Sequence, residues 1–387
     1  MNALPDGWTR RRVEELVRVT RGASPRPIND WIAHEGTPWV KISDATASRA
    51  RVISATREFI RNEGRARSVV VHPGDLIVSN SATPGIPRFM GIEACIHDGW
   101  LLLRDLRGLD PSFMYYTIEN DRSLLLEQGN GSIFTNLKTE ILKRHQIAVP
   151  PLAEQQAIAE VLSALDDKIA ANTALAERAD ELMHRTFRSM TAASEVPLSG
   201  TADFVNGKAF TKGASGTGRV VVRIAELNGG ISGSTVFSDA IVDDKHVARP
   251  GDILFAWSGS LTLHRWFRDE AIVNQHIFKV IPRDRYPAWL VYELVRQKLV
   301  DFKAIAADKA TTMGHIQRHH LDEVVGIPFS SEVDRLNPLM SALWGAALNA
   351  EQESRTLAAT RDALLPQLMS GKLRVRDAEE AASAAGV

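Results

Sequence analysis

Apolar positions recur at helical spacing in two long stretches of the chain, residues 151–190 and 330–375. Neither stretch contains a cluster of Gly and Pro, and the apolar positions follow one another in steps of three and four residues. The seam of the first stretch consists of Ile158, Leu162, Leu165 and Ile169. Because this spacing is that of an apolar seam in a coiled coil, the pattern predicts one long helix in each stretch.

The second stretch repeats the spacing of the first at an offset of about 178 residues, and such an internal repeat constrains the fold. Its seam consists of Leu336, Met340, Leu343, Leu357 and Leu364. Asn172 interrupts the first seam. A lone Asn on a seam often fixes the helix register at some cost in stability, and here it can equally mark a solvated gap.

A helix of this length is about 50 Å long and cannot bury its apolar stripe against a small domain alone. We therefore expect the two helices to pack against each other, antiparallel, as a rigid rod between two globular units. The alternative is that each helix docks only on its own domain.

The segments that precede the two helices, residues 1–150 and 191–329, have the pattern of short strands mixed with helices. Pro73-Gly74-Asp75 is followed by an apolar strand, and Pro250-Gly251-Asp252 repeats this arrangement. Pro and Gly before a strand indicate a turn. The fold class expected is α+β, with two similar mixed α/β domains and a pseudo-twofold repeat. Residues 376–387, rich in Ala and acidic side chains, are expected to be a disordered tail.

Composition and charge narrow the class of protein. Apolar residues make up 44% of the chain and charged residues 24%, as in globular proteins, and no apolar run approaches the roughly 20 residues that span a bilayer. The single cysteine, Cys95, excludes an intramolecular disulfide and a Cys-rich metal site, and we expect a cytoplasmic protein. The net charge of −1 argues against indiscriminate coating of nucleic acid. Residues 1–150 and 191–329 are nevertheless slightly basic, and the two helical stretches slightly acidic.

Two further motifs carry a family resemblance. The first helix opens with Pro151-Leu152-Ala153-Glu154-Gln155, and the second ends with Leu364-Leu365-Pro366-Gln367-Leu368-Met369-Ser370-Gly371-Lys372-Leu373. With the two alternating domains, these motifs closely resemble the specificity subunit of type I restriction-modification systems over nearly the whole chain. The resemblance implies two target-recognition domains, residues 1–150 and 191–329, that each read half of a split DNA site. It also implies spacer helices, residues 151–190 and 330–375, that set the half-site spacing.

The resemblance further implies partners. Two modification (methyltransferase) subunits would dock on the helices, and restriction subunits would join through them. S-adenosylmethionine and ATP would bind to those partner subunits and no cofactor to this chain.

Motifs of an enzyme are missing from the sequence. Asn337-Pro338-Leu339 lacks the second Pro and the aromatic residue of an amino-methyltransferase motif, and Gly207-Lys208 lacks the earlier Gly of a phosphate-binding loop. His319 and His320 are adjacent, so they do not share one helical face with His315 to hold a metal ion. We therefore expect no catalytic residue and no metal site. The remaining alternatives are a stand-alone DNA-binding regulator, a nuclease or methyltransferase, and a peptide-binding scaffold.

Residues suited to DNA follow the two Pro-Gly-Asp strands. Base edges in the major groove are read by Arg, Lys, Asn, Gln, Ser and Thr, and phosphates are held by Lys, Arg and hydroxyls. The candidates here are Ser79, Asn80, Ser81, Thr83, Arg88, Trp257, Ser258, Ser260, His264 and Arg265. If Arg265 reads a base, Arg265→Ala costs about 1–3 kcal/mol and relaxes one site position. The alternative is that both segments are ordinary polar hairpin loops.

Two later segments, 128–138 and 309–318, form a second group of candidates that combines hydroxyls, amides and basic side chains. Its members are Ser132, Thr135, Asn136, Lys138, Lys309, Thr311, Thr312, His315, Gln317 and Arg318. Weaker candidates lie near strand ends, and they are Arg21, Lys41, Lys208 and Arg223.

Overall fold

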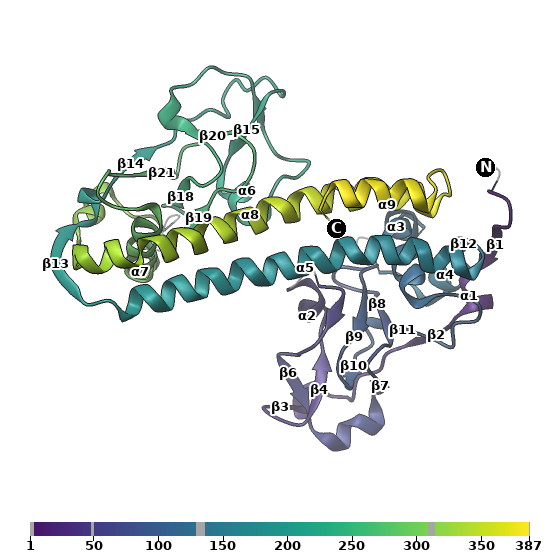
Figure 1. Ribbon diagram of the computed structural model, residues 1–387. Helices are drawn as coiled ribbons and strands as arrows, with labels where there is room; N and C mark the ends of the chain where they lie inside the picture. Colours follow the sequence, from purple (N-terminus) through teal and green to yellow (C-terminus); the bar gives the residue numbers. More distant parts are fainter. Residues whose placement is uncertain (1–3, 48–49, 129–135, 309–313, 387) are drawn as a thin grey trace. The chain divides into compact units, whose positions relative to one another are not determined.

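The computed structural model describes residues 4–47, 50–128, 136–308 and 314–386 of the chain (Figure 1). The chain forms two compact units. Unit 1 consists of Met1–Ala171 together with Ser354–Val387, and unit 2 consists of Asn172–Glu353. Two long helices, α5 (Leu152–Ser189) and α8 (Ser330–Met369), each contribute one part to each unit. Both predicted long helices are therefore present.

The two long helices pack side by side in each unit, and they run antiparallel. In unit 2, Asn172 of α5 bonds to Glu353 of α8, whereas Met183, further along α5, shares a core with Met340, which comes earlier in α8. In unit 1, Arg361 of α8 donates to Asp166 of α5. Rising residue numbers in one helix thus meet falling numbers in the other, which confirms the predicted antiparallel packing.

The predicted seam residues lie in the core. Ile158, Leu162 and Leu165 are buried with Leu357 and Leu364 in unit 1, where Ile169 packs against them. In unit 2, Met340 is buried and Leu336 and Leu343 pack against the same core.

Asn172 is only 5% exposed, and its Nδ2 donates to Glu353 Oε2 at 2.7 Å. Of the two interpretations of this position, the structure has the buried, paired Asn and not the solvated gap. Beside it the helices meet through small side chains, namely Ala176, Ala179, Ala347 and Ala350.

Unit 1 contains two five-stranded sheets. The first has the order β2-β11-β8-β9-β5, with bounds Arg18–Arg21, Trp100–Arg104, Leu76–Ser79, Pro87–Met90 and Val52–Ile53. The second has the order β3-β6-β4-β10-β7, with bounds Ile32–Ala33, Glu58–Ile60, Thr37–Val40, Ala94–Ile96 and Val69–Val71. A pair of strands, β1 (Thr9–Arg12) and β12 (Gln146–Val149), joins the start of the domain to the segment before α5. Helix α3 (Pro111–Glu127) begins at Asp110, whose side chain caps the backbone N–H of Phe113.

Unit 2 repeats this topology. One sheet has the order β14-β21-β18-β19, with bounds Ala202–Asn206, Ile277–Pro282, Ile253–Ala256 and Thr262–Arg265. The other has the order β16-β15-β20-β17, with bounds Phe237–Ser238, Arg219–Val222, Ala271–Val273 and Val247–Ala248. Strand β20 pairs in parallel with β15 as β10 does with β4, and β13 (Ala192–Pro197) pairs with β22 (Val324–Pro328) as β1 does with β12. Helix α7 (Ala288–Asp308) takes the place of α3. The predicted internal repeat is thus present in three dimensions.

The Pro-Gly-Asp motif makes the same turn in both units. Gly74 and Gly251 adopt positive φ angles of 89° and 94°, which glycine tolerates without strain. The carboxylate of Asp75 accepts the backbone N–H of His72 at 2.7 Å, and Asp252 accepts that of Arg249 at 2.7 Å. The motif therefore fixes where strands β8 and β18 begin.

The end of the chain differs from the disordered tail expected for residues 376–387. Residues Val375–Ala384 form helix α9, and Ala378 and Ala382 on one face are buried in the core of unit 1. Alanine is the best helix former and its small side chain allows close packing. Composition alone, which the prediction used, does not show this face.

Cys95 is fully buried in strand β10, and burial raises the pKa of its thiol, as expected for a small core residue. Among the helices that the structure describes, none combines the length and the apolar content that a membrane crossing requires.

Candidate nucleic-acid interface

Unit 1 carries a polar cavity of about 470 Å³ where strands β2, β8 and β11 end or begin. Arg21 ends β2, Asn80 follows β8, and Asp98 and Gly99 precede β11. The cavity is lined by Arg21, Asn80, Ser81, His97, Asp98, Gly99, Asn136, Leu137, Lys138 and Thr139. The lining brings together the segment after the first Pro-Gly-Asp strand and the segment before α4 (Thr139–Arg144). The two groups of candidates predicted from distant parts of the sequence therefore meet here.

Asp98 organises the polar groups of this cavity. Its carboxylate accepts the Ser24 hydroxyl at 2.7 Å and the Arg26 guanidinium at 3.2 Å. Its backbone carbonyl accepts Arg21 Nε at 2.8 Å and Asn80 Nδ2 at 3.1 Å. The hydrogen bond from Ser24 and the charge of Arg26 hold the pKa of Asp98 below its usual value. Asp98 thus orients two exposed guanidinium groups.

A second cavity of about 410 Å³ shares His97 and Asp98 with the first. Its wall includes Trp39 and Lys41, and Lys41 Nζ lies 2.5 Å from Glu58 Oε1. Burial lowers the pKa of His97, so its ring is neutral at pH 7, and its Nδ1 accepts the backbone N–H of Gly99. The combined surface presents basic side chains beside amides, which suits phosphates and base edges respectively.

Trp257 of unit 2 occupies the position of Asn80. Both follow the Pro-Gly-Asp strand directly. The backbone N–H of Asn80 donates to the carbonyl of Gly99, and that of Trp257 donates to the carbonyl of His276 in the same way. The repeat therefore places an amide at this point of one unit and an indole at the same point of the other.

Trp257 lies in an aromatic and polar cluster. Its ring centroid is 5.2 Å from that of His276 and 6.4 Å from that of His315, and its Nε1 donates to Asn206 Oδ1 at 2.8 Å. Three polar atoms of neighbouring chain segments, Ser258 Oγ, Asn274 Oδ1 and His276 Nδ1, are buried with no hydrogen-bond partner in the described part of the chain. Buried polar atoms without partners are costly. The cluster is therefore a candidate binding surface.

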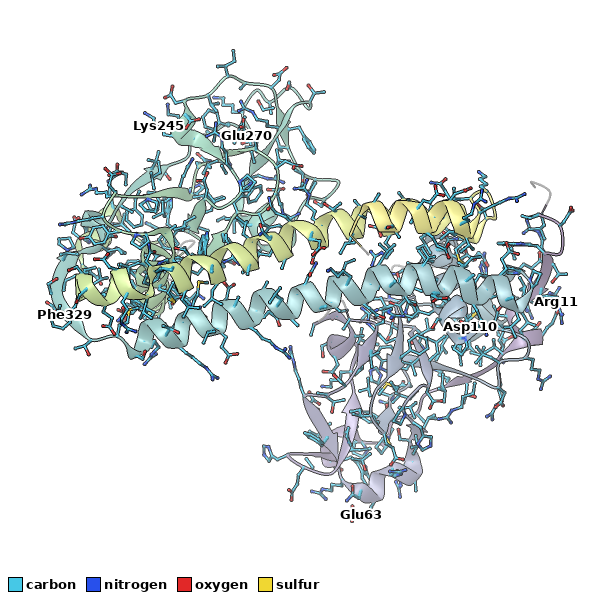
Figure 2. The ribbon with its side chains drawn as sticks, viewed as in Figure 1. Arg11, Glu63, Asp110, Lys245, Glu270 and Phe329 are labelled. Carbon is cyan, nitrogen blue, oxygen red and sulfur yellow. The ribbon has the colours of Figure 1, made fainter. Side chains whose placement is uncertain are left out.

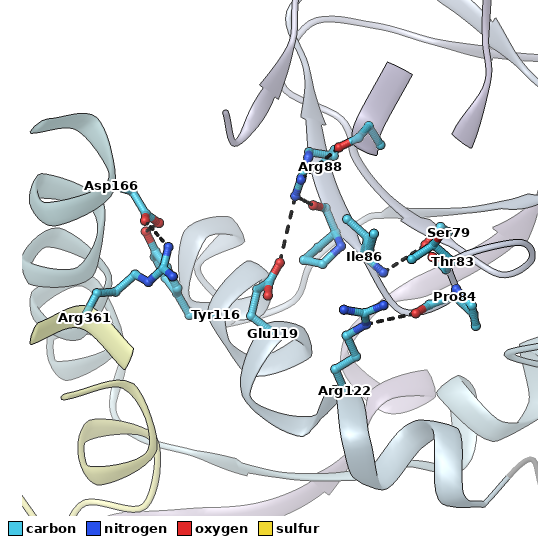
Figure 3. A network of polar contacts seen from close by, with 12 residues as sticks. Ser79, Thr83, Pro84, Ile86, Arg88, Tyr116, Glu119, Arg122, Asp166 and Arg361 are labelled. Atoms are coloured by element: carbon cyan, nitrogen blue, oxygen red, sulfur yellow. Dashed lines mark hydrogen bonds and ion pairs between the residues drawn. The ribbon is translucent and has the colours of Figure 1, made fainter. Parts of the chain in front are cut away.

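Two predicted DNA contacts of unit 1 point into the domain instead (Figure 3). Ser79 is fully buried, and its hydroxyl donates to the Thr83 carbonyl at 2.6 Å and accepts from the Ile86 N–H at 2.9 Å. Arg88 is buried and donates to the carbonyls of Pro87 and Ala45. Ser79 therefore shapes the turn after β8, and Arg88 braces the domain. Neither side chain offers surface to a base.

Arg265, another predicted DNA contact, is also buried inside its domain. Its side chain is 2% exposed, and it donates to Asp180 Oδ1 of α5 and to Glu351 Oε2 of α8, each at 3.0 Å. Its guanidinium also lies over the Trp344 ring at 4.7 Å. Arg265 joins strand β19 to both long helices within unit 2, so it holds the domain together and does not face a ligand.

The other predicted contacts have mixed locations. Ser81, Asn136 and Lys138 line the first cavity, whereas His264 Nε2 lies 3.2 Å from Asn228 Oδ1. Ser260, Gln317 and Arg318 are exposed, and Ser258 forms an isolated β-bridge with His315. Five predicted residues lie outside the described part of the chain, namely Ser132, Thr135, Lys309, Thr311 and Thr312.

Sequence reasoning missed the residues that come just before β11 and just before β21. They are His97 and Asp98 in unit 1 and Asn274 and His276 in unit 2. The repeat could have pointed to this segment, because His97 and Asn274 are separated by the same offset as the two Pro-Gly-Asp motifs. Within the described ranges, no group of three His, Cys, Asp or Glu side chains is placed to share a metal ion.

Comparison with known proteins agrees with this arrangement. Residues 5–180 match the model of the type I restriction modification DNA specificity domain. The match thus covers the first domain and most of the first long helix. The type I restriction enzyme MjaIX specificity subunit of Methanocaldococcus jannaschii is 22% identical, over 97% of this chain and 95% of that protein. The putative MjaX specificity subunit of the same organism is 30% identical over 26% of this chain and 24% of that protein.

A solved structure supports the fold of this chain. The type I restriction-modification S subunit from M. genitalium has a TM-score of 0.59 and 16% identity, and the match covers 95% of this chain and 97% of that one. The polar cavity of unit 1 and the Trp257 cluster of unit 2 are the candidate recognition surfaces of the chain.

Proposed function

We propose that this chain is a type I specificity subunit that recognises a bipartite DNA site, that each unit reads one half-site, and that the chain itself contributes no catalytic group. The observation that carries the proposal is the repeated position of the two clusters. The same backbone framework presents Asn80 in unit 1 and Trp257 in unit 2. A duplicated domain with different side chains at the same point suits two half-sites of different sequence.

The chemistry of each cluster supports direct readout. In unit 1, the exposed Asn136 matches the donor and acceptor pair of adenine, and Arg21 matches the two acceptors of guanine. Asn80 is 6% exposed and its Nδ2 donates to the Asp98 carbonyl, so it supports these side chains from behind. In unit 2, Trp257 offers an apolar face for a thymine methyl group, and His315 offers a ring nitrogen. Lys138 is placed for a phosphate.

We further propose that two modification subunits dock on α5 and α8 and that restriction subunits join through them. The seam residues are buried between the helices, so docking uses the outward faces. Leu175 and Leu182 of α5 and Leu339 of α8 are exposed large apolar side chains, which suits a protein interface. S-adenosylmethionine and ATP would bind to those partners. The cytoplasmic location stays a prediction.

The proposal is tested by mapping methylated motifs in cells that express this subunit with its modification subunits. We expect one bipartite motif that disappears when the subunit is deleted. Asn136→Ala should relax one half of the motif and Trp257→Ala the other, while the control Lys303→Ala, an exposed residue of α7 that lines neither the unit 1 cavity nor the Trp257 cluster, leaves the motif unchanged. Loss of both halves with either single variant, in a protein that remains folded, would contradict separate reading by the two units.

A further inference from the structure

Unit 2 contains a cavity of about 940 Å³ that the recognition clusters do not include. It lies beside strand β14, between the short 3₁₀ helices Asp244–His246 and Arg318–Asp322. Its charged lining is mostly basic. The cations are Lys208, Lys245, Arg283 and Arg318, and the carboxylates are Asp203 and Asp322.

The two carboxylates are already engaged. Asp203 pairs with Arg283 at 3.1 Å, and Asp322 accepts the Ser199 hydroxyl at 2.6 Å. Lys208 and Arg318 are exposed and form no ion pair with any residue that the structure describes. Lys245, which lies at the surface of unit 2 (Figure 2), has only a loose contact of 3.6 Å with Asp243. The cationic side chains of the lining therefore outnumber its carboxylates, and the cavity is positively charged.

His246 supplies an independent sign of a ligand. It lines the cavity, is 3% exposed, and packs edge-on against Phe210 at 5.7 Å. Neither of its ring nitrogens has a hydrogen-bond partner in the described ranges of the chain. Burial, and then the charges of Lys208 and Lys245, lower the pKa of His246, so the ring is neutral at pH 7 with one N–H to donate. An anionic oxygen would satisfy that donor, whereas burial without a partner is costly.

Unit 1 lacks these groups at the corresponding positions. Strand β17 pairs with β20 as β7 pairs with β10, and this register places Ser68 and Val69 where unit 2 has Lys245 and His246. Ser68 donates to the Ala23 carbonyl at 2.8 Å, so its hydroxyl is engaged within the domain. The basic cavity is therefore a property of unit 2 and not of the repeated framework.

The cavity borders the recognition cluster of its unit. Asn206 lines the cavity and also accepts the hydrogen bond of Trp257 Nε1. Lys208 forms a parallel β-bridge with Asn274, whose buried side-chain oxygen has no hydrogen-bond partner in the described part of the chain. In duplex DNA the phosphates flank the grooves in which bases are read, so a phosphate site next to a base-reading surface has the required arrangement.

We propose that this cavity binds a backbone phosphate of the DNA whose bases face Trp257, held by Lys208 and Lys245 with His246 as the inner hydrogen-bond donor. The proposal rests on the proposed function, since it assigns a phosphodiester to the same DNA-binding face. The chemistry shared by every ligand of this site is a phosphate group, and free phosphate is the other source.

The test measures DNA binding by the full-length chain over a range of salt concentrations. Lys208→Gln and Lys245→Gln are compared with Lys303→Gln, an exposed lysine of the same unit that does not line this cavity. Fluorescence anisotropy uses a duplex with the cognate motif and a scrambled duplex. Each lost phosphate contact should reduce the slope of log K against log salt by about 0.9, which corresponds to about eightfold weaker binding at 0.1 M salt. The loss should be equal on both duplexes.

The outcomes separate the two proposals. An unchanged salt slope, in a protein that still prefers the cognate duplex, overturns the phosphate site and leaves the proposed function intact. A loss confined to the cognate duplex also overturns it, because the lysines would then read bases. If the unmodified chain has no sequence preference, the proposed function fails, while the slope still reports on the phosphate site.

A second arm uses inorganic phosphate as the probe. It follows the ring resonances of His246, assigned with His246→Gln, as phosphate is added. A shift on titration with phosphate, combined with DNA binding that neither lysine variant alters, would assign the site to free phosphate and overturn the DNA assignment. A shift of the His246 ring resonances that the cognate duplex also produces supports the assignment to a DNA phosphate.

Discussion

Replacing Arg265 should destabilise unit 2 rather than relax DNA specificity. The Arg265→Ala change removes a cation that bonds to Asp180 and Glu351 and lies over Trp344. Breaking a buried ion pair costs about 3–5 kcal/mol, because it leaves carboxylates buried without their partner. Asp180 and Glu351 keep 32% and 25% of their side-chain surface, so solvent recovers part of that loss. We expect a decrease of about 3 kcal/mol in the free energy of unfolding, or roughly a hundredfold in the equilibrium constant.

The assay is equilibrium unfolding in urea, followed by circular dichroism and by tryptophan fluorescence, since Trp344 contacts the replaced group. Arg265→Lys keeps the charge but not the guanidinium contact with both carboxylates. Its free energy of unfolding should therefore lie between those of Arg265→Ala and the unmodified chain. Arg318→Ala, which removes an exposed arginine, is the matched control and should change stability by less than about 0.5 kcal/mol.

The effect of pH gives a second readout. Burial raises the pKa of Glu351, whereas the charge of Arg265 lowers it. Without Arg265, the Glu351 carboxylate takes up a proton more readily in the folded state. The ionised carboxylate therefore lowers the free energy of unfolding at pH values above its raised pKa, and this effect becomes smaller at pH values below that pKa. The destabilisation by Arg265→Ala should therefore shrink as the pH falls toward 5. A variant that unfolds at the same urea concentration as the unmodified chain, yet loses discrimination at one base pair, would refute the structural role of Arg265.

Three other changes have defined expected outcomes. Asp98→Asn removes the charge that orients Arg26, so it should weaken binding to the half-site of unit 1 about tenfold, as loss of one charge-assisted contact does, in a binding titration. Ala350→Leu overpacks the close contact of the long helices and should lower stability by about 1–3 kcal/mol in urea. Gly207→Ala places a Cβ 2.1 Å from the Asn274 carbonyl oxygen and should lower the thermal midpoint by several degrees, whereas Gly229→Ala, with open space around it, should not.

For each of these three predictions, one outcome would contradict the reasoning. Asp98→Asn would count against the orienting role if it weakened binding to both half-sites equally. A stable Ala350→Leu variant would show that the helices have room to separate at this point. Equal thermal midpoints for the two glycine variants would mean that the backbone at Gly207 shifts at little cost.

The sequence predicted the repeat and the long helices because both depend on local spacing. The steps of three and four residues from Ile158 to Ile169 and the turn at Gly74 are visible without knowledge of the fold. The role of Arg265 is not, because its partner Asp180 is distant in the sequence and no local pattern links them. Helix α9 was missed for a similar reason, since burial of Ala378 depends on a core that the rest of unit 1 supplies. The burial of two candidate DNA contacts, Ser79 and Arg88, could not be predicted, because side-chain type does not reveal which face of a strand is buried.

The division of the chain has a consequence for its synthesis. Unit 2 is one continuous segment, Asn172–Glu353, whereas unit 1 needs Ser354–Val387 to complete the core that begins with Trp8 and Val13. On the ribosome, the first domain to be translated must therefore wait for roughly 10–40 s, at about 5–20 residues per second, while the second is made. The domain that starts later can finish folding first. During that delay the apolar face of the early half of α5 lacks the later half of α8, which covers it in the folded chain. This segment is therefore where a chaperone is most needed.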